Sequence, residues 1–194
     1  MKIFLTGGSG DLGQRVIPLL KKEGHTPINF DIREPPSKIG EFNKGSLLNP
    51  SQILTAIEGA DLVIHIAAWH GIHETHGWKT QQDFLDLNVD GTHNLIAACA
   101  NHAVSRVIHI SSSSVSKANG IYGHTKRMAE EIMSHAHHTL QMDIITLRPR
   151  AFIPPDNHTV YSGFNEWAKR FWLGAVHIDD VAQSLINSVR LLES

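Results

Sequence analysis

Several features that mark extracellular, membrane or nucleic-acid-binding proteins are scarce in this sequence. The single cysteine, Cys99, allows no disulfide within the chain, and no apolar run reaches the roughly 18 residues that favour a membrane-spanning helix. Neither sign of charge dominates, with 17 Lys and Arg against 19 Asp and Glu. The apolar start meets a glycine turn too early for a signal peptide. We therefore expect a cytoplasmic protein that binds a small molecule and contacts neither nucleic acid nor a membrane.

Histidine, in contrast, is abundant, with 14 copies in 194 residues. An exposed imidazole titrates near pH 6.5, so many of these side chains are expected to gain charge in mildly acidic solution. The length suits one α/β domain with a sizeable core rather than two full domains.

Short apolar runs alternate with longer helical patterns through most of the chain. The expected strands are residues 2–6, 27–32, 61–67, 106–111 and 143–148. The expected helices between them are residues 11–23, 50–58, 81–101 and 122–137. This alternation predicts an α/β fold with a doubly wound parallel sheet.

Two stretches interrupt the alternation. Residues 33–43 contain Pro35, Pro36 and Gly40, which predict a surface connection because paired prolines break both ladders and helices. Residues 149–163 are irregular, and helical patterns follow at 164–173 and 178–192. We therefore expect a core at residues 1–148 and a reduced C-terminal substrate or lid region, residues 149–194, packed on it.

A glycine-rich turn follows the first expected strand directly and opens an amphipathic helix. Gly7 permits a tight turn, Gly10 lets the backbone approach a pyrophosphate, and Gly13 allows the helix to pack closely on the strand. The free N–H groups and the positive dipole of the helix N-terminus suit phosphate. The turn predicts a Rossmann-type site for a dinucleotide.

Asp31 ends the second expected strand, 18 residues after Gly13, where a carboxylate can accept hydrogen bonds from ribose hydroxyls. This favours NAD over NADP. Arg33 argues the other way, since an arginine can hold a 2′-phosphate, but the charge of Asp31 would repel one.

Tyr122 and Lys126 are four residues apart at the start of a helical pattern, so their side chains share one face. The strand before them ends in four serines, Ser111 to Ser114, at the edge where open α/β sheets bind ligands. A phenol is a poor base at pH 7, but the Lys126 ammonium and a cationic nicotinamide would favour its phenolate. A serine hydroxyl would orient the substrate oxygen, so these groups suit proton and hydride transfer.

The chain resembles the extended short-chain dehydrogenase/reductase family, also known as the NAD-dependent epimerase/dehydratase family. The matching stretches, spread over nearly the whole length, are residues 6–13 (TGGSGDLG), 61–68 (DLVIHIAA), 88–99 (NVDGTHNLIAAC), 110–115 (ISSSSV), 122–126 (YGHTK), 147–155 (LRPRAFIPP) and 176–183 (VHIDDVAQ).

The resemblance implies roles for particular residues. Ser112, Tyr122 and Lys126 take the catalytic positions, with Ser113 in reserve for the serine. The implied cofactor contacts are Gly7, Gly10, Asp11, Leu12, Gly13, Asp31, Leu47, Ala67, Ala68, Asn88, Tyr122, Lys126 and Pro149. The family's acidic residue near adenine has no counterpart, because Ser46 stands in its place.

Two departures bear on the substrate. Only nine residues separate Ser112 from Tyr122, and only 46 follow Arg148, so a covering loop and the lobe that grips nucleotide sugars are expected to be reduced. We therefore expect a small sugar, uronate or related hydroxy compound, with a nucleotide sugar as the alternative. Ser112, Ser113, His70 and Arg150 are the expected substrate contacts; an arginine beside the site could hold a carboxylate.

The loop that follows the third expected strand carries His70, His73, Glu74 and His76. Three alternatives stand: a metal site, polar contact with substrate, or a mobile solvated loop. The expected chemistry needs no metal, so none is expected.

The sequence does not separate net dehydrogenation from epimerisation or dehydration that regenerates NAD. A catalytically silent NAD-sensing module is the alternative from another class. Family resemblance also suggests a homodimer, paired through the helices at 81–101 and 122–137.

Overall fold

The computed structural model describes residues 1–37, 40–116 and 120–193. Its centre is a six-stranded parallel sheet in the order β3-β2-β1-β4-β5-β6. The strands are β1 Lys2–Thr6, β2 Thr26–Asp31, β3 Glu41–Lys44, β4 Leu62–His65, β5 Arg106–Ile110 and β6 Asp143–Leu147. The strand order reverses between β1 and β4, so the predicted doubly wound, Rossmann-type fold is confirmed.

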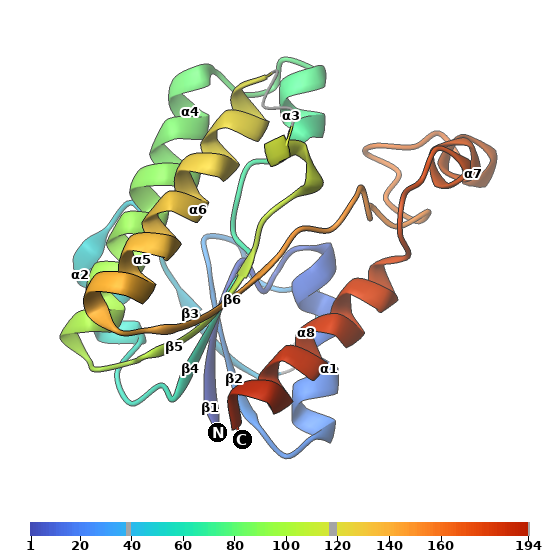
Figure 1. Cartoon of the computed structure of the whole chain (residues 1–194). Helices are drawn as coiled ribbons and strands as arrows, with labels where there is room; N and C mark the ends of the chain where they lie inside the picture. The colour runs from blue at the N-terminus through green and yellow to red at the C-terminus, as the bar shows by residue number, and fades with distance from the viewer. Residues whose placement is uncertain (38–39, 117–119, 194) are drawn as a thin grey trace.

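Helices cover both faces of the sheet (Figure 1). On one face α1 (Asp11–Lys22) packs beside α8 (Ile178–Glu193), with Val16 and Leu20 of α1 in the same apolar cluster as Leu185 of α8. On the other face lie α2 (Pro50–Ala56), α5 (Gly91–Asn101) and α6 (Ile121–Leu140). Because the sheet is covered on both sides, its central strands β1 and β4 are mostly apolar and almost fully buried.

The expected helix at residues 81–101 is continuous but not uniform. It consists of α4 (Gln81–Leu85), a π-helical turn at Asp86–Asp90, and α5. Such turns occur often at functional positions, and this one contains the buried Asn88.

Two short elements were not expected from the sequence. The prediction of a surface connection through residues 33–43 was wrong in part, because β3 begins at Glu41 and pairs with β2 as the edge strand. The supposed loop after β4 contains the short helix α3, Gly71–Thr75. A 3-10 turn at Ser113–Ser116 follows β5, and residues 117–119 of the shortened loop lie outside the described residues.

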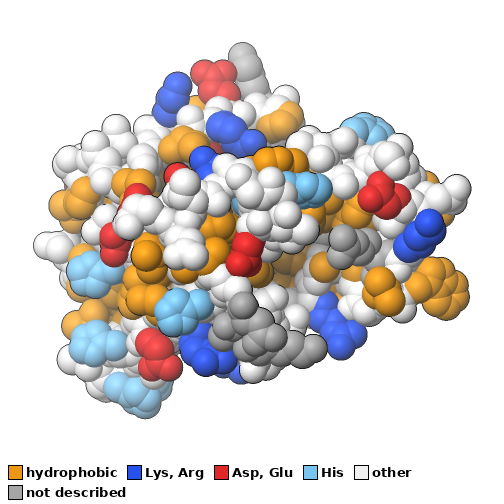
Figure 2. Space-filling view, turned by 90° about the horizontal axis from the view of Figure 1, so that it is seen from above, with side chains coloured by type: hydrophobic (Ala, Val, Ile, Leu, Met, Phe, Trp, Pro, Cys, Tyr) orange, Lys and Arg blue, Asp and Glu red, His pale blue; other side chains and the backbone are white. Residues whose placement is uncertain are grey.

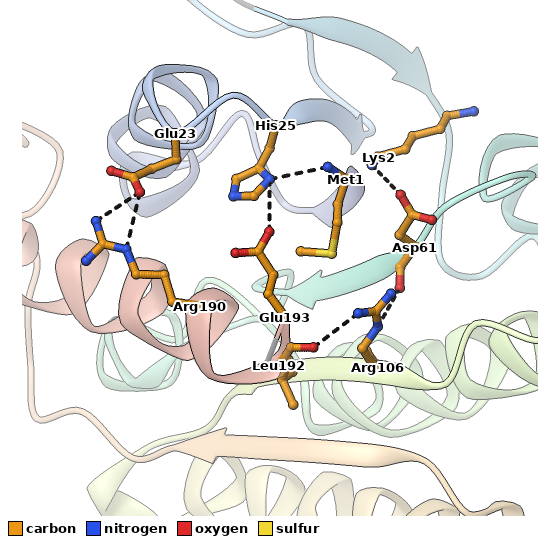
Figure 3. Close-up of polar contacts among 9 residues, drawn as sticks. All are labelled: Met1, Lys2, Glu23, His25, Asp61, Arg106, Arg190, Leu192 and Glu193. Carbon is orange, nitrogen blue, oxygen red and sulfur yellow. Dashed lines mark hydrogen bonds and ion pairs between the residues drawn. The ribbon is translucent and has the colours of Figure 1, made fainter.

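The C-terminal helix is tied to the rest of the molecule where both termini meet (Figure 3). Arg190 donates to Glu23 Oε2 at 2.9 and 3.2 Å, and Arg106 Nη1 donates to Leu192 O at 3.1 Å. Together with its apolar contacts to α1, these bonds make α8 part of one layer of the core.

The segment between β6 and α8 is the least enclosed part of the fold. It includes α7 (Phe164–Trp172), which stands apart from the other helices in Figure 1. Phe164, Trp172 and Leu173 are 65%, 89% and 81% exposed. The view from above shows hydrophobic side chains at this projecting end (Figure 2). Among the described helices, none is both long and apolar enough to cross a membrane.

Candidate active site

The glycine turn has the backbone geometry that a phosphate-binding turn needs. Gly7 has a φ of +75°, and a Cβ there would lie 2.7 Å from Ala67 N. A Cβ on Gly13 would collide with the backbone of Gly8, so the helix can pack this closely only with glycine. Among the described residues, no side chain caps the helix at Gly10, which leaves N–H groups of the first turn of α1 for a ligand.

Other residues expected near the cofactor surround this turn. Asp11 is exposed and accepts a hydrogen bond from Asn157 Nδ2 at 2.8 Å, so the segment after β6 reaches over the start of α1. Leu12 is buried in the core beside it. Ala67 N donates to Thr6 O at 3.1 Å, and Ala68 follows it at the same edge of the sheet, partly buried.

Asp31 lies at the end of β2 with its carboxylate turned to the glycine turn. One oxygen accepts from Ser9 N at 3.1 Å and the other from Arg33 N at 3.0 Å. The side chain is 8% exposed, so these bonds hold a carboxylate in a fixed position beside the turn. Leu47, expected near adenine, is buried, and its carbonyl oxygen accepts from Asn94 Nδ2 at 2.9 Å.

Ser112 and Tyr122 meet at the carboxyl edge of β5. Ser112 is 7% exposed, accepts from Ser114 N at 3.1 Å, and shares a hydrogen bond with the Tyr122 phenol. Burial raises the pKa of Tyr122, and the bond with Ser112 only partly offsets this. The sequence suggested a phenolate favoured by Lys126; in this structure the phenol is held in its protonated form.

Lys126 lies on the same helix face, but its ammonium points into the protein. Nζ donates to Ile110 O at 2.6 Å and lies 3.3 Å from His109 Nε2. Burial lowers the pKa of Lys126 to about 8, against a smaller opposite effect of Glu130. The lysine therefore remains mostly charged at pH 7 and loses its charge at a lower pH than an exposed lysine would.

Two buried histidines extend the lysine's contacts toward the glycine turn. His109 stacks on His65 with ring centroids 5.6 Å apart. His65 Nδ1 lies 2.7 Å from Thr6 Oγ1, and Nε2 lies 2.9 Å from Thr92 Oγ1. A chain of polar and ring contacts thus joins Lys126 to Thr6, the residue before the turn.

Four histidines are exceptions to the expectation that many of these side chains gain charge near pH 6. Burial, followed by the charge of Lys126, lowers the pKa of His65 to about 3, and the same causes hold the pKa of His109 well below 6.5. Burial and the neighbouring His73 lower the pKa of His70 to about 4, and burial is also the main cause of the lowered pKa of His73. The rings of His65, His70 and His109 therefore stay neutral in mild acid.

Asn88 connects the histidine-rich segment, residues 69–79, to α6. Its Oδ1 accepts from Trp69 N at 2.8 Å, and its Nδ2 donates to Trp69 O at 2.9 Å and to Thr125 Oγ1 at 3.1 Å. The asparagine is 1% exposed, so all of these bonds are sheltered from water. None of these bonds reaches Lys126; Asn88 contacts α6 through Thr125, the residue before the lysine.

Two other expected substrate contacts, Ser113 and Arg150, are exposed. Ser113 is exposed, and its N–H donates to the carbonyl oxygen of Pro149 at 3.0 Å. Arg150 is exposed and donates from Nη1 to Gly174 O at 3.3 Å. Its neighbour Arg148 is engaged with both carboxylate oxygens of Glu130, at 2.6 and 2.8 Å.

The histidine-rich segment is ordered by ring contacts. His70 caps α3, and its ring centroid lies 4.2 Å from that of His73. His76 stacks on Trp78 at 4.6 Å, and the Lys79 ammonium lies 4.1 Å from the Trp69 ring centroid. Across the described ranges, no three His, Cys, Asp or Glu side chains gather in a way that could hold a metal.

Two residues at this site make contacts that the sequence did not predict. His109 contacts Lys126 from β5, and Glu74 accepts hydrogen bonds from the first turn of α6. The alternation of side chains along β5 offered a weak signal for His109, whereas the contact of Glu74 joins residues 47 apart and leaves no periodic signal.

Comparison with known proteins agrees with the fold. Residues 3–179 match the model of the NAD dependent epimerase/dehydratase family. The chain therefore belongs to this family, whose members include reductases, dehydrogenases and epimerases of the extended short-chain dehydrogenase/reductase type.

Among individual relatives, a 2-alkyl-3-oxoalkanoate reductase of Stenotrophomonas maltophilia is 29% identical over 88% of this chain and 56% of its own length. A 3-beta-hydroxysteroid dehydrogenase of Mycolicibacterium neoaurum is 26% identical over 82% of this chain and 50% of its own. A short-chain dehydrogenase/reductase superfamily protein of Agrobacterium tumefaciens, solved with bound NAD, is 27% identical with a TM-score of 0.68, covering 76% of this chain and 48% of that one. The chain thus spans about half the length of these relatives.

Proposed function

We propose that this protein binds NAD at the glycine turn and transfers hydride at a carbinol or carbonyl carbon of a small substrate. The observation that carries this is the partly buried Tyr122, whose phenol is hydrogen-bonded with Ser112 at the edge of the sheet where the glycine turn also lies. The turn suits the cofactor because Gly7 and Gly13 let the backbone pack tightly around it. A Cβ at either position would collide with backbone atoms of Ala67 or Gly8. Asp31 would receive the ribose hydroxyls.

The residues of the chain then divide the proton chemistry. Bound NADH would supply hydride to a carbonyl, and NAD would accept it in the reverse direction. Ser112 orients the substrate oxygen, and Tyr122 donates a proton to it. A raised phenol pKa suits this donor, because the phenol carries its proton at neutral pH. In the oxidising direction, the charge of Lys126 favours the phenolate that removes the proton.

A small sugar or uronate is the proposed substrate. Arg150 supports a carboxylate, because its neighbour Arg148 is already paired with Glu130 and Arg150 is exposed at this edge. The segment between β6 and α8 is short, and α7 projects away from the core, which favours a small substrate over a nucleotide sugar.

The test combines cofactor binding with turnover. We expect NAD to bind and a sugar or uronate to release NADH at 340 nm, with Tyr122→Phe lowering kcat by about 100-fold or more while NAD binding is retained. An epimerase would turn over the substrate with no net absorbance change. NAD binding without any turnover would identify the NAD-sensing alternative, and micromolar calorimetric binding of a UDP-sugar would contradict the small substrate.

We also propose a homodimer through α5 and α6, as in other members of the family. The apolar positions of these helices, such as Leu95 and Met133, pack into the subunit's own core, so a dimer would pair their outward, more polar positions. Light scattering that detects only monomer would rule this out.

A further inference from the structure

The first turn of α6 receives its cap from a distant part of the chain. The helix begins after Gly120, which has no side chain to cap it. Glu74 of α3 takes that place: Oε1 accepts from Ile121 N at 2.7 Å and Oε2 from Tyr122 N at 3.3 Å. A carboxylate at a helix N-terminus satisfies otherwise unpaired N–H groups and complements the helix dipole.

Two glycines make this close approach possible. A Cβ on Gly120 would collide with the Glu74 carboxylate. A Cβ on Gly71, at the start of α3, would lie 3.2 Å from Cδ1 of the Tyr122 ring. One short helix therefore contacts both the backbone and the ring of Tyr122.

The helix that carries Glu74 is itself fixed from two sides. His73 packs edge-on against Trp69 with ring centroids 4.9 Å apart, and it also forms the capping box with His70. Asn88 holds both backbone polar groups of Trp69. Asn88 also bonds Thr125 on α6, so the same asparagine connects α6 to Trp69, which precedes α3.

We propose that Glu74 is a positioning residue for the reaction: its carboxylate holds the first turn of α6, and with it the Tyr122 side chain, at the carboxyl edge of the sheet. This rests on the proposed function in one respect, namely that Tyr122 is the reacting phenol. It assigns a task to the histidine-rich segment that requires neither a metal nor a mobile loop.

The charge of Glu74 has an effect separate from its hydrogen bonds. The titratable groups around Tyr122 are Glu74 of α3, His70 and His73 of the same segment, Lys126 of α6 and His109 of β5. The histidines are neutral at pH 7, so the Glu74 carboxylate and the Lys126 ammonium are the charged members of this group. A negative charge disfavours a phenolate, and an uncompensated helix N-terminus favours one.

The test compares two substitutions of Glu74. Glu74→Ala removes both acceptors, and we expect kcat to fall about 10- to 100-fold, since a small misplacement of a reacting group has an effect of this size. The KM for NAD should stay within about twofold, because the glycine turn lies on another element. Glu74→Gln keeps one acceptor and should restore most of kcat. By removing the charge it should also shift the acid limb of the kcat profile for oxidation about 0.5 pH unit lower.

Glu131→Gln is the matched control, because it removes the same charge from an exposed position further along α6. It should leave kcat, KM and the pH profile unchanged. The proposal is overturned if Glu74→Ala retains the wild-type kcat, if kcat and the affinity for NAD fall together, or if Glu74→Gln is as slow as the alanine variant.

A second measurement does not depend on turnover. Hydrogen exchange of the Ile121 and Tyr122 amides should accelerate in Glu74→Ala and stay near the wild-type rate in Glu74→Gln and Glu131→Gln. Wild-type exchange in Glu74→Ala would overturn the positioning role. If the unaltered protein turned over no substrate while exchange changed as expected, the proposed function would fail and the contact between α3 and α6 would stand.

Discussion

The glycine turn after β1 and the first turn of α6 lie at the same edge of the sheet, yet they are built from different parts of the chain. Around the turn, backbone atoms approach one another so closely that a single methyl at Gly7 or Gly13 has no room. At the first turn of α6, side chains from several elements meet: Ser112 bonds the Tyr122 phenol, Glu74 accepts from the Tyr122 N–H, and His109 contacts Lys126 one turn further on. The turn should therefore respond most to added volume, and the surroundings of Tyr122 most to altered charge and proton binding.

The largest effect is expected from added volume in the glycine turn. Gly13→Val would place a branched side chain against the backbone of Gly8. We expect a loss of about 1–3 kcal/mol in the free energy of unfolding and no measurable NAD binding. Urea unfolding and calorimetry with NAD measure the two effects, and Gly24→Ala, whose Cβ would meet no atom within 4 Å but whose φ is +84°, controls for backbone strain alone. Normal NAD binding by Gly13→Val would show that the glycine turn tolerates added volume.

An intermediate effect is expected from removing the negative charge of Asp31 beside the glycine turn. Asp31→Asn keeps a polar side chain beside Ser9 and Arg33 but removes the negative charge. The preference for NAD over NADP should fall about tenfold, which is about 1.4 kcal/mol, because a 2′-phosphate is no longer repelled. The ratio of dissociation constants for the two cofactors measures this. An unchanged ratio would show that the charge of Asp31 has little influence on the choice between NAD and NADP.

The smallest effect concerns the contribution of His109 to the free energy of unfolding. Its pH dependence is absent at pH 7 and appears only on acidification. Since the pKa of His109 is lowered, the unfolded chain takes up a proton below pH 6.5 that the folded chain does not bind. The stability that neutral His109 contributes is therefore complete above 6.5 and is lost as the pH falls toward the folded pKa. His109→Phe should weaken this pH dependence in urea unfolding between pH 7 and about pH 4. An identical slope in both proteins would mean that the ring is not held neutral.

The sequence predicted the order of strands and helices because a sheet covered on both faces needs continuous apolar strands, as in β1 and β4. The edge strand β3 has four partly buried or exposed residues and follows two prolines, so its hydrophobic pattern was too weak to predict it.

The side-chain contacts around Tyr122 were less predictable. The contact of Lys126 with His109 joins residues 17 apart, and the bonds of Glu74 join residues 47 and 48 apart. No local periodicity encodes such contacts. Burial raises the pKa of Tyr122, whereas the sequence suggested that Lys126 would favour its phenolate. Local rules therefore predicted the glycine turn well, because its geometry depends on neighbouring residues.

The π-helical turn at Asp86–Asp90 has a consequence for how the long helix fits the molecule. A π turn accommodates one residue more than an α turn, and one residue corresponds to about 100° of rotation around the axis. Phe84 before the turn and Leu95 after it are both fully buried, so an apolar side chain enters the core on each side of this rotation. The additional residue is taken up where Asn88 must reach Trp69 and Thr125 at once, so the irregularity lets one helix satisfy the hydrophobic core and a polar junction together.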